Sequence, residues 1–130
     1  MLKVAGLQLR LEDGKKEKNL ARALEALRRI ASREKEIDIF CLPELFDTGF
    51  NYASLKDIAE ELPGKTTNVL MNFAEEFQSY IIAGIAERCE NKIFDSAVMI
   101  SPKGKFCVFI EKLTCFKMKR TTLLVVIKYL

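Results

Sequence analysis

The chain has 130 residues, 49% of them hydrophobic and 30% charged, with 21 Lys and Arg against 18 Asp and Glu. This length and composition predict one globular domain with a buried core and are too small for two domains. The sequence contains no histidine, which excludes Ser-His-Asp and Cys-His nucleophile pairs and His-ligated metal sites. Any catalysis by these residues must therefore use Glu, Asp, Lys, Cys or Tyr.

The formal charge of +3 is too small to predict nucleic-acid binding, and it is unevenly distributed. Residues 1–110 hold 16 basic and 17 acidic side chains, a sum of −1, whereas residues 111–130 hold five basic and one acidic, a sum of +4. The basic segment ends in the apolar run 123–127, which is not typical of a solvated interaction arm.

The composition also bears on the compartment and on cofactors. No basic and apolar secretory signal opens the sequence, and no apolar run approaches the ~20 residues that span a bilayer, so we expect a cytoplasmic protein with no membrane contact. The cysteines lie far apart and show no Cys-x-x-Cys spacing, which predicts neither a metal site nor disulfides. We expect each of them to be a small core residue, and no cofactor is indicated; they are Cys41, Cys89, Cys107 and Cys115.

Hydrophobic periodicity at the start of the chain predicts a strand, a helix and a second strand. Apolar residues alternate over 2–9, and Asp13-Gly14 marks a turn. They then recur at helical spacing over 15–33, with charged residues on the other face. The short apolar run 37–42, halted by Pro43, is typical of a strand buried on both faces.

The remaining elements predict a single α/β layer with a mixed sheet. Ser54 is expected to cap a short helix that ends at Leu62, and a second helix is expected over 66–78. Strands are expected over 80–86, 93–101 and 105–112, the last two joined by the hairpin turn 102–104. The order β-α-β-α-α-β-β-β shows no repeat and no linker.

Two side chains at strand ends are candidates for chemistry. Glu44 follows a buried strand at the end where α/β proteins bind ligands, and burial there can raise its pKa toward that of a general base; the alternative is an exposed loop carboxylate. Lys112 closes the apolar segment 106–110 and can stabilise an oxyanion; the alternative is a lysine at an exposed strand end. Cys41 lies inside its strand without an activating base beside it in sequence, so we expect a core residue.

Several short segments, taken together and in order, resemble the nitrilase superfamily of carbon-nitrogen hydrolases. The segments 42–46 (Leu-Pro-Glu-Leu-Phe) and 48–50 (Thr-Gly-Phe) resemble its first signature, and 3–8 resembles its first strand. Further matches are Asp95-Ser96-Ala97 before an apolar strand, Pro102-Lys103-Gly104-Lys105, and the lysine at 112. The resemblance runs from residue 1 to about residue 113.

The resemblance implies a fold and an activity. The family fold is a four-layer αββα sandwich, of which residues 1–113 would supply the first half, a mixed sheet with helices on one face. Its Glu-Lys-Cys site cleaves small-molecule amides or nitriles through a thioester. Carried over by motif, Glu44 is the general base and Lys112 the oxyanion stabiliser, while the nucleophilic cysteine has no counterpart. We therefore expect a truncated, amidase-type hydrolase whose 130-residue chain is inactive because it lacks the nucleophile.

The family pattern breaks immediately after Lys112, at the point where the charge balance changes. Thr114 stands where the family has His, and Lys119 stands where it has a second Glu; Asp95 replaces a usual Asn. For one permitted choice of codons, insertion of a single adenine at the Lys112 codon shifts the reading frame so that His is encoded at position 114 and Glu at position 119. Residues 114–130 are therefore interpreted as a divergent tail, produced either by a frameshift or by evolution of a natural fragment.

Other functions stay open at this stage. Half a sandwich would expose apolar surface and strand edges, so we expect self-association or a homo-oligomer. A non-catalytic fragment that pairs with a full-length relative is the main alternative. A flavodoxin-like binding domain is disfavoured because no Gly-rich phosphate loop follows the first strand.

Overall fold

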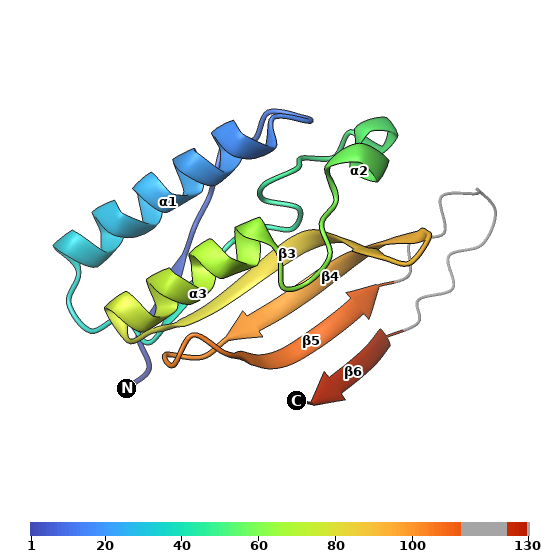
Figure 1. The fold of residues 1–130 in the computed structure, drawn as a ribbon. Helices are drawn as coiled ribbons and strands as arrows, with labels where there is room; N and C mark the ends of the chain where they lie inside the picture. The colour runs from blue at the N-terminus through green and yellow to red at the C-terminus, as the bar shows by residue number, and fades with distance from the viewer. Residues whose placement is uncertain (113–124, 130) are drawn as a thin grey trace.

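The computed structural model describes residues 1–112 and 125–129, which include three helices and one mixed sheet (Figure 1). The helices are α1 (Lys16–Arg33), α2 (Tyr52–Ile58) and α3 (Lys65–Phe77). The strands are β1 (Val4–Gly6), β2 (Ile39–Cys41), β3 (Tyr80–Cys89), β4 (Lys92–Ile100), β5 (Phe106–Lys112) and β6 (Val125–Tyr129).

The described strands lie in the sheet in chain order, β1-β2-β3-β4-β5-β6. The first three are parallel, and β3 to β6 form antiparallel pairs. This confirms the predicted order up to residue 112 and the mixed sheet, whereas β6 was not predicted. The turn between β4 and β5 is closed by the amide of Gly104, which donates to the Ser101 carbonyl, as hairpin chemistry indicated.

Helices α1 and α3 lie side by side over one face of the sheet, as predicted (Figure 1). Their apolar faces and the alternate residues of β3 form the main core, in which Leu27, Leu70 and Ile81 are fully buried. Phe40 of β2 meets Phe73 of α3 edge to face, with ring centroids 5.4 Å apart. Burying each such side chain stabilises the fold by about 1.5–3 kcal/mol.

The opposite face of the sheet is only partly covered in the described residues. Successive strand side chains point to opposite faces, so Ile82 of β3 and Met99 of β4 point away from α1 and α3, and both are half-buried. At the margin of this face the side chains of Val4 and Tyr80 are 52% and 37% exposed. Within residues 1–112 and 125–129, an apolar sheet surface therefore remains open.

Several local predictions were wrong, including the end of α2, which lies at Ile58 and not at Leu62. Helix α2 starts at Tyr52 and is capped by Asn51, whose side chain accepts from the Ala53 amide, whereas Ser54 donates to the Asn51 carbonyl. Asn51 is the cap because it directly precedes the first turn of α2, where its side-chain oxygen can accept from a backbone amide; Ser54 lies inside the helix. Cys89, expected in the core, is exposed because it ends β3 beside a turn.

Some expectations lie outside the described residues, namely the boundary at 113, Thr114, Cys115 and Lys119. Among the helices that are described, none combines the length and the apolar composition needed to cross a bilayer.

Candidate active site

Glu44 lies in a loop, residues 43–50, that leaves the carboxyl end of β2 and runs on beside β3. The Gly84 amide donates to the Pro43 carbonyl at 3.4 Å, and the Phe46 amide donates to the Gly84 carbonyl at 3.3 Å. The first half of the loop thus continues the contact that β2 makes with β3. This arrangement holds the Glu44 backbone against the sheet.

Gly84 is required by this close approach. A Cβ added at residue 84 would lie 2.6 Å from the Glu44 Cα and 3.1 Å from the Leu45 nitrogen, both backbone atoms that cannot rotate away. Leu45 itself adopts a positive φ of 48° as the loop turns. The position of Glu44 therefore depends on the absence of a side chain on β3.

Glu44 lines two pockets on the sheet. One, of about 290 Å³, is formed with the half-buried apolar face of β3 and β4; its other lining residues are Leu42, Ile82, Ala83, Gly84, Asp95 and Ala97. The second, of about 570 Å³, also contains Cys41, Gln8 and Phe50. A carboxylate among mostly apolar walls is suited to proton transfer with a substrate that enters from outside.

The ladder brings the position of Lys112 toward this site. Asp95, which lines the smaller pocket with Glu44, is directly opposite Ala86 in β3 and Lys112 in β5. The two sequence candidates, Glu44 and Lys112, are thus linked through one residue of β4. The structural description of Lys112 is confined to its place in this ladder.

Cys41 lines the same pocket as Glu44, which the sequence did not indicate. It is half-buried at the end of β2 and lines the larger pocket with Glu44, so its expected place as a core residue was wrong. Strand alternation puts it on the face opposite Phe40, which is the residue that enters the core.

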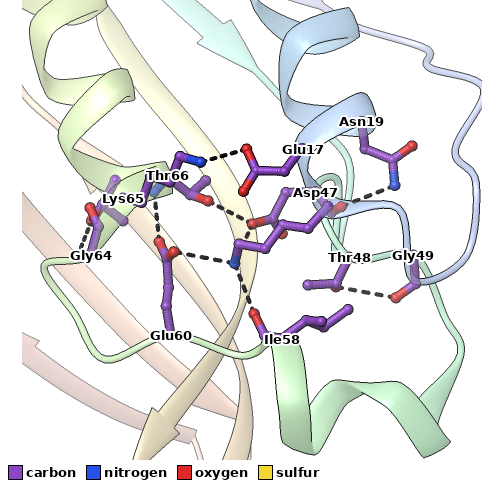
Figure 2. Close-up of polar contacts among 12 residues, drawn as sticks. Glu17, Asn19, Asp47, Thr48, Gly49, Ile58, Glu60, Gly64, Lys65 and Thr66 are labelled. Carbon is purple, nitrogen blue, oxygen red and sulfur yellow. Dashed lines mark hydrogen bonds and ion pairs between the residues drawn. The ribbon is translucent and has the colours of Figure 1, made fainter.

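The second half of the loop is held by a buried charge cluster (Figure 2). Asp47 is completely buried, and its Oδ2 lies 2.9 Å from the Lys16 Nζ of α1 and accepts from the Thr66 hydroxyl of α3 at 2.7 Å. Glu60 Oε2 lies 3.2 Å from the same ammonium, and Glu60 Oε1 accepts from the Thr66 amide at 2.8 Å. One lysine therefore ties the loop to α1 and to the segment that leads into α3.

Backbone groups of this half are fixed by the segment before α1 and by its first turns. Asn19, fully buried, donates through its side-chain amide to the carbonyls of Asp47 and Glu12. Asp13 accepts from the Phe50 amide at 2.9 Å. Gly49 has a φ of +70°, and a Cβ there would lie 2.5 Å from the Asp13 carboxylate. The loop is consequently clamped at both of its ends.

Glu12, which lies just before α1, has a shifted pKa. Hydrogen bonds from Lys18 and then from Arg22 lower the pKa of Glu12 from 4.5 to about 2. The carboxylate is charged at neutral pH and ties the segment before α1 to the helix itself.

The geometry agrees with comparisons to known proteins. The Carbon-nitrogen hydrolase family profile matches residues 3–122. The chain belongs to this family. It is 34% identical over 108 residues to a nitrilase of Pyrococcus abyssi, covering 80% of this chain and 40% of that protein, and 31% identical to the omega-amidase NIT2 of Bos taurus, covering 88% and 41%. The chain thus spans about two fifths of the length of these relatives.

Solved structures of this carbon-nitrogen hydrolase fold superpose on most of the chain. A CN-hydrolase superfamily protein of Xanthomonas campestris, XC1258, matches with a TM-score of 0.76 at 22% identity, over 85% of this chain and 40% of its own. An N-terminal amidase matches with a TM-score of 0.74 at 26% identity, over 85% and 28%. These likenesses confirm the predicted fold class for the described residues.

The sequence predicted Glu44 as a site residue but gave no prediction for the residues that hold its loop. Asn19 gave a signal, because it is a polar residue among apolar ones on the buried stripe of α1. Lys16 and Asp47 looked like ordinary surface charges in a helix start and a loop. Gly84 stood inside an apolar strand, where a glycine indicates close approach of another backbone.

Proposed function

We propose that this chain supplies the general base and the oxyanion-stabilising lysine for hydrolysis of a carbon-nitrogen bond in a small amide or nitrile, an amide being the favoured substrate. The observation that supports it most is the placement of Glu44, which lines two pockets while its loop is fixed at both ends. Family membership agrees with the same chemistry.

In the proposed reaction, Glu44 takes the proton of a cysteine thiol as the thiolate attacks the substrate carbon. Lys112 stabilises the tetrahedral oxyanion, and the leaving amine takes the proton from Glu44 as the thioester forms. Glu44 then removes a proton from the water that attacks the thioester, and it returns this proton to the departing thiolate as the acid is released. In the family pattern the nucleophile follows the lysine by some tens of residues, and none of the four cysteines occupies that place. We therefore propose that the 130-residue polypeptide alone is inactive.

A chimera tests this proposal. Residues 1–112 of this chain replace the matching segment of the Pyrococcus abyssi nitrilase, and hydrolysis of a panel of amides and nitriles is measured. Glu44→Gln and Lys112→Met should each lower kcat/KM by about 10²- to 10⁴-fold, whereas Glu90→Gln, at an exposed turn residue, should have little effect. A chimera that keeps its activity after Glu44→Gln would refute the role of the base, and amide hydrolysis by the unfused polypeptide would refute its inactivity.

The open sheet face favours a second candidate, a non-catalytic fragment that pairs with a copy of itself or with a full-length relative. Half-buried Ile82 and Met99, with Val4 and Tyr80 exposed beside them, provide the apolar surface. Sedimentation of the purified chain, alone and mixed with a relative, distinguishes the two: a monomer that binds no relative would argue against pairing.

The proposed setting is the cytoplasm, where the thiols would stay reduced. For residues 114–130 we propose a frameshift at the Lys112 codon, because Thr114 and Lys119 depart from the family pattern together. Sequencing the coding DNA tests it: the other reading phase should encode the missing His and Glu, and a frame that encodes neither would favour an evolved fragment.

A further inference from the structure

Asp47 lies three residues after Glu44 and is a fully buried carboxylate in contact with α1 and α3. We propose that Asp47 is a positioning residue for Glu44, and that it acts through its buried ion pair with Lys16. The inference rests on the proposed function only for the role of Glu44 as a base; the placement of Glu44 by this pair can be tested without any activity.

The Lys16 ammonium of this ion pair has three polar contacts. The Lys16 ammonium contacts the carboxylates of Asp47 and Glu60 and donates to the Ile58 carbonyl at 3.1 Å, which occupies its three protons. The Lys16 side chain is 13% exposed and that of Asp47 is not exposed at all. Water screens such a pair far less than a surface pair, so the charges fix a definite geometry.

Little chain separates this pair from Glu44. Phe46, the residue before Asp47, is fully buried in the main core and donates to the Gly84 carbonyl. The Gly49 amide donates to the Leu45 carbonyl at 2.9 Å and closes a turn across the loop. A shift of Asp47 must therefore move Phe46 and Leu45, and with them the backbone of Glu44.

Stability alone does not explain a buried pair at this position. Desolvation of both charges offsets most of their attraction, and apolar residues of similar size are often as stable. The second oxygen of Asp47, Oδ1, has no hydrogen-bond donor among the described residues, which is a further cost. A role in positioning Glu44 would explain why the Asp47–Lys16 pair is buried despite these costs in free energy.

The test uses the isotope-labelled 130-residue chain and measures amide hydrogen exchange in the loop together with the NMR signals of Glu44. Hydrogen exchange of the Phe46 and Gly49 amides reports the position of the loop, and the carbon resonance of the Glu44 carboxyl reports its titration. Asp47→Asn and Lys16→Met should each speed exchange of both amides by about tenfold or more and displace the Glu44 backbone resonances in the same sense. Glu76→Gln, which removes the exposed Arg28–Glu76 pair, should change neither.

The two variants remove charges of opposite sign, which separates movement from a direct field effect. If the charges acted on Glu44 only through space, the two substitutions would shift its titration in opposite directions and leave exchange unchanged, and the proposal would be wrong. A lower melting temperature in Asp47→Asn with unaltered Glu44 signals would reduce Asp47 to a structural residue and also overturn it.

A double variant that removes both charges keeps the proposal testable if either single variant fails to fold. The chain with Lys16→Met and Asp47→Asn has no unpaired charge at residue 47, and Glu60, which also loses Lys16, is 14% exposed and keeps the hydrogen bond from the Thr66 amide. This variant should fold, yet exchange of the Phe46 amide should still be about tenfold faster than in the native chain. Native exchange in this double variant would overturn the proposal. Because no readout depends on hydrolysis, failure here and failure of the chimera experiment are distinguishable.

Discussion

The two halves of the Glu44 loop are held in contrasting ways. Residues 43–46 are held on β3 by backbone hydrogen bonds and by the empty place at Gly84, so this half depends on shape. Residues 47–50 are held by ionised side chains, chiefly Lys16, so this half depends on charge. The first half is packed against the sheet and the core, whereas the second is specified by particular polar partners, so we expect the two halves to fail differently on mutation.

The charged half should give the largest loss of stability. Lys16→Met leaves the Asp47 carboxylate buried without its cation, and breaking a buried pair in this way costs about 3–5 kcal/mol. Urea unfolding followed by circular dichroism measures the free energy. Lys18→Met is the matched control on the same helix: Lys18 is 60% exposed and pairs with Glu12 at the surface, so it should cost about 0–1 kcal/mol. Equal losses would contradict the contrast between the two halves.

The half held by shape should respond to a single methyl group. Gly84→Ala places a Cβ against the Glu44 backbone and should cost about 1–3 kcal/mol, as overpacking does. Gly6→Ala, in β1, is the control, because a Cβ there meets no atom within 4 Å. Thermal unfolding of the two variants side by side gives the difference, and a Gly84→Ala protein as stable as Gly6→Ala would show that the loop shifts without cost.

The acid response should be the smallest effect, and it should come from Glu12, whose backbone is hydrogen-bonded to Asn19, one of the residues that hold the charged half. The pKa of Glu12 is lowered from 4.5 to about 2 by Lys18 and Arg22. A folded-state pKa below the unfolded one gives stability that is complete above about pH 4.5 and is lost as the pH falls toward 2. Glu12→Gln should therefore lower stability at pH 7 and flatten its decline between pH 4.5 and 2, as measured by urea unfolding at several pH values. An unchanged slope in that range would contradict it.

Most of the fold could be predicted from the sequence because its elements are strongly patterned. A local sequence pattern marks each of three elements: the apolar stripe of α1, the short apolar run before Pro43, and the hairpin turn at 102–104. Boundaries were less accurate: β1 is shorter than expected and β3 extends to Cys89, because strand length depends on pairing partners that no local pattern contains.

Only part of the candidate site could be proposed from the sequence, for a related reason. Glu44 follows from its place after a buried strand, whereas Asp47 and Lys16 gain their meaning only when α1 docks beside the loop. A charged residue at a helix start is solvated in most proteins, so its burial cannot be predicted from its neighbours in sequence. Gly84 differs, because a glycine inside a strand indicates a close approach, but the sequence around it does not say that its partner is a backbone 40 positions earlier.

The contacts that fix the loop also set an order of events in folding. Asp47 binds Asn19 from 28 positions away and Thr66 from 19 positions away, so its cage closes only after α1 and α3 have both reached the sheet. Long-range contacts of this kind form late, because the entropy of closing the intervening chain must be lost first. A partly folded chain would thus have its helices before the Glu44 loop is fixed, and the geometry of the candidate site would arise only at the end of folding.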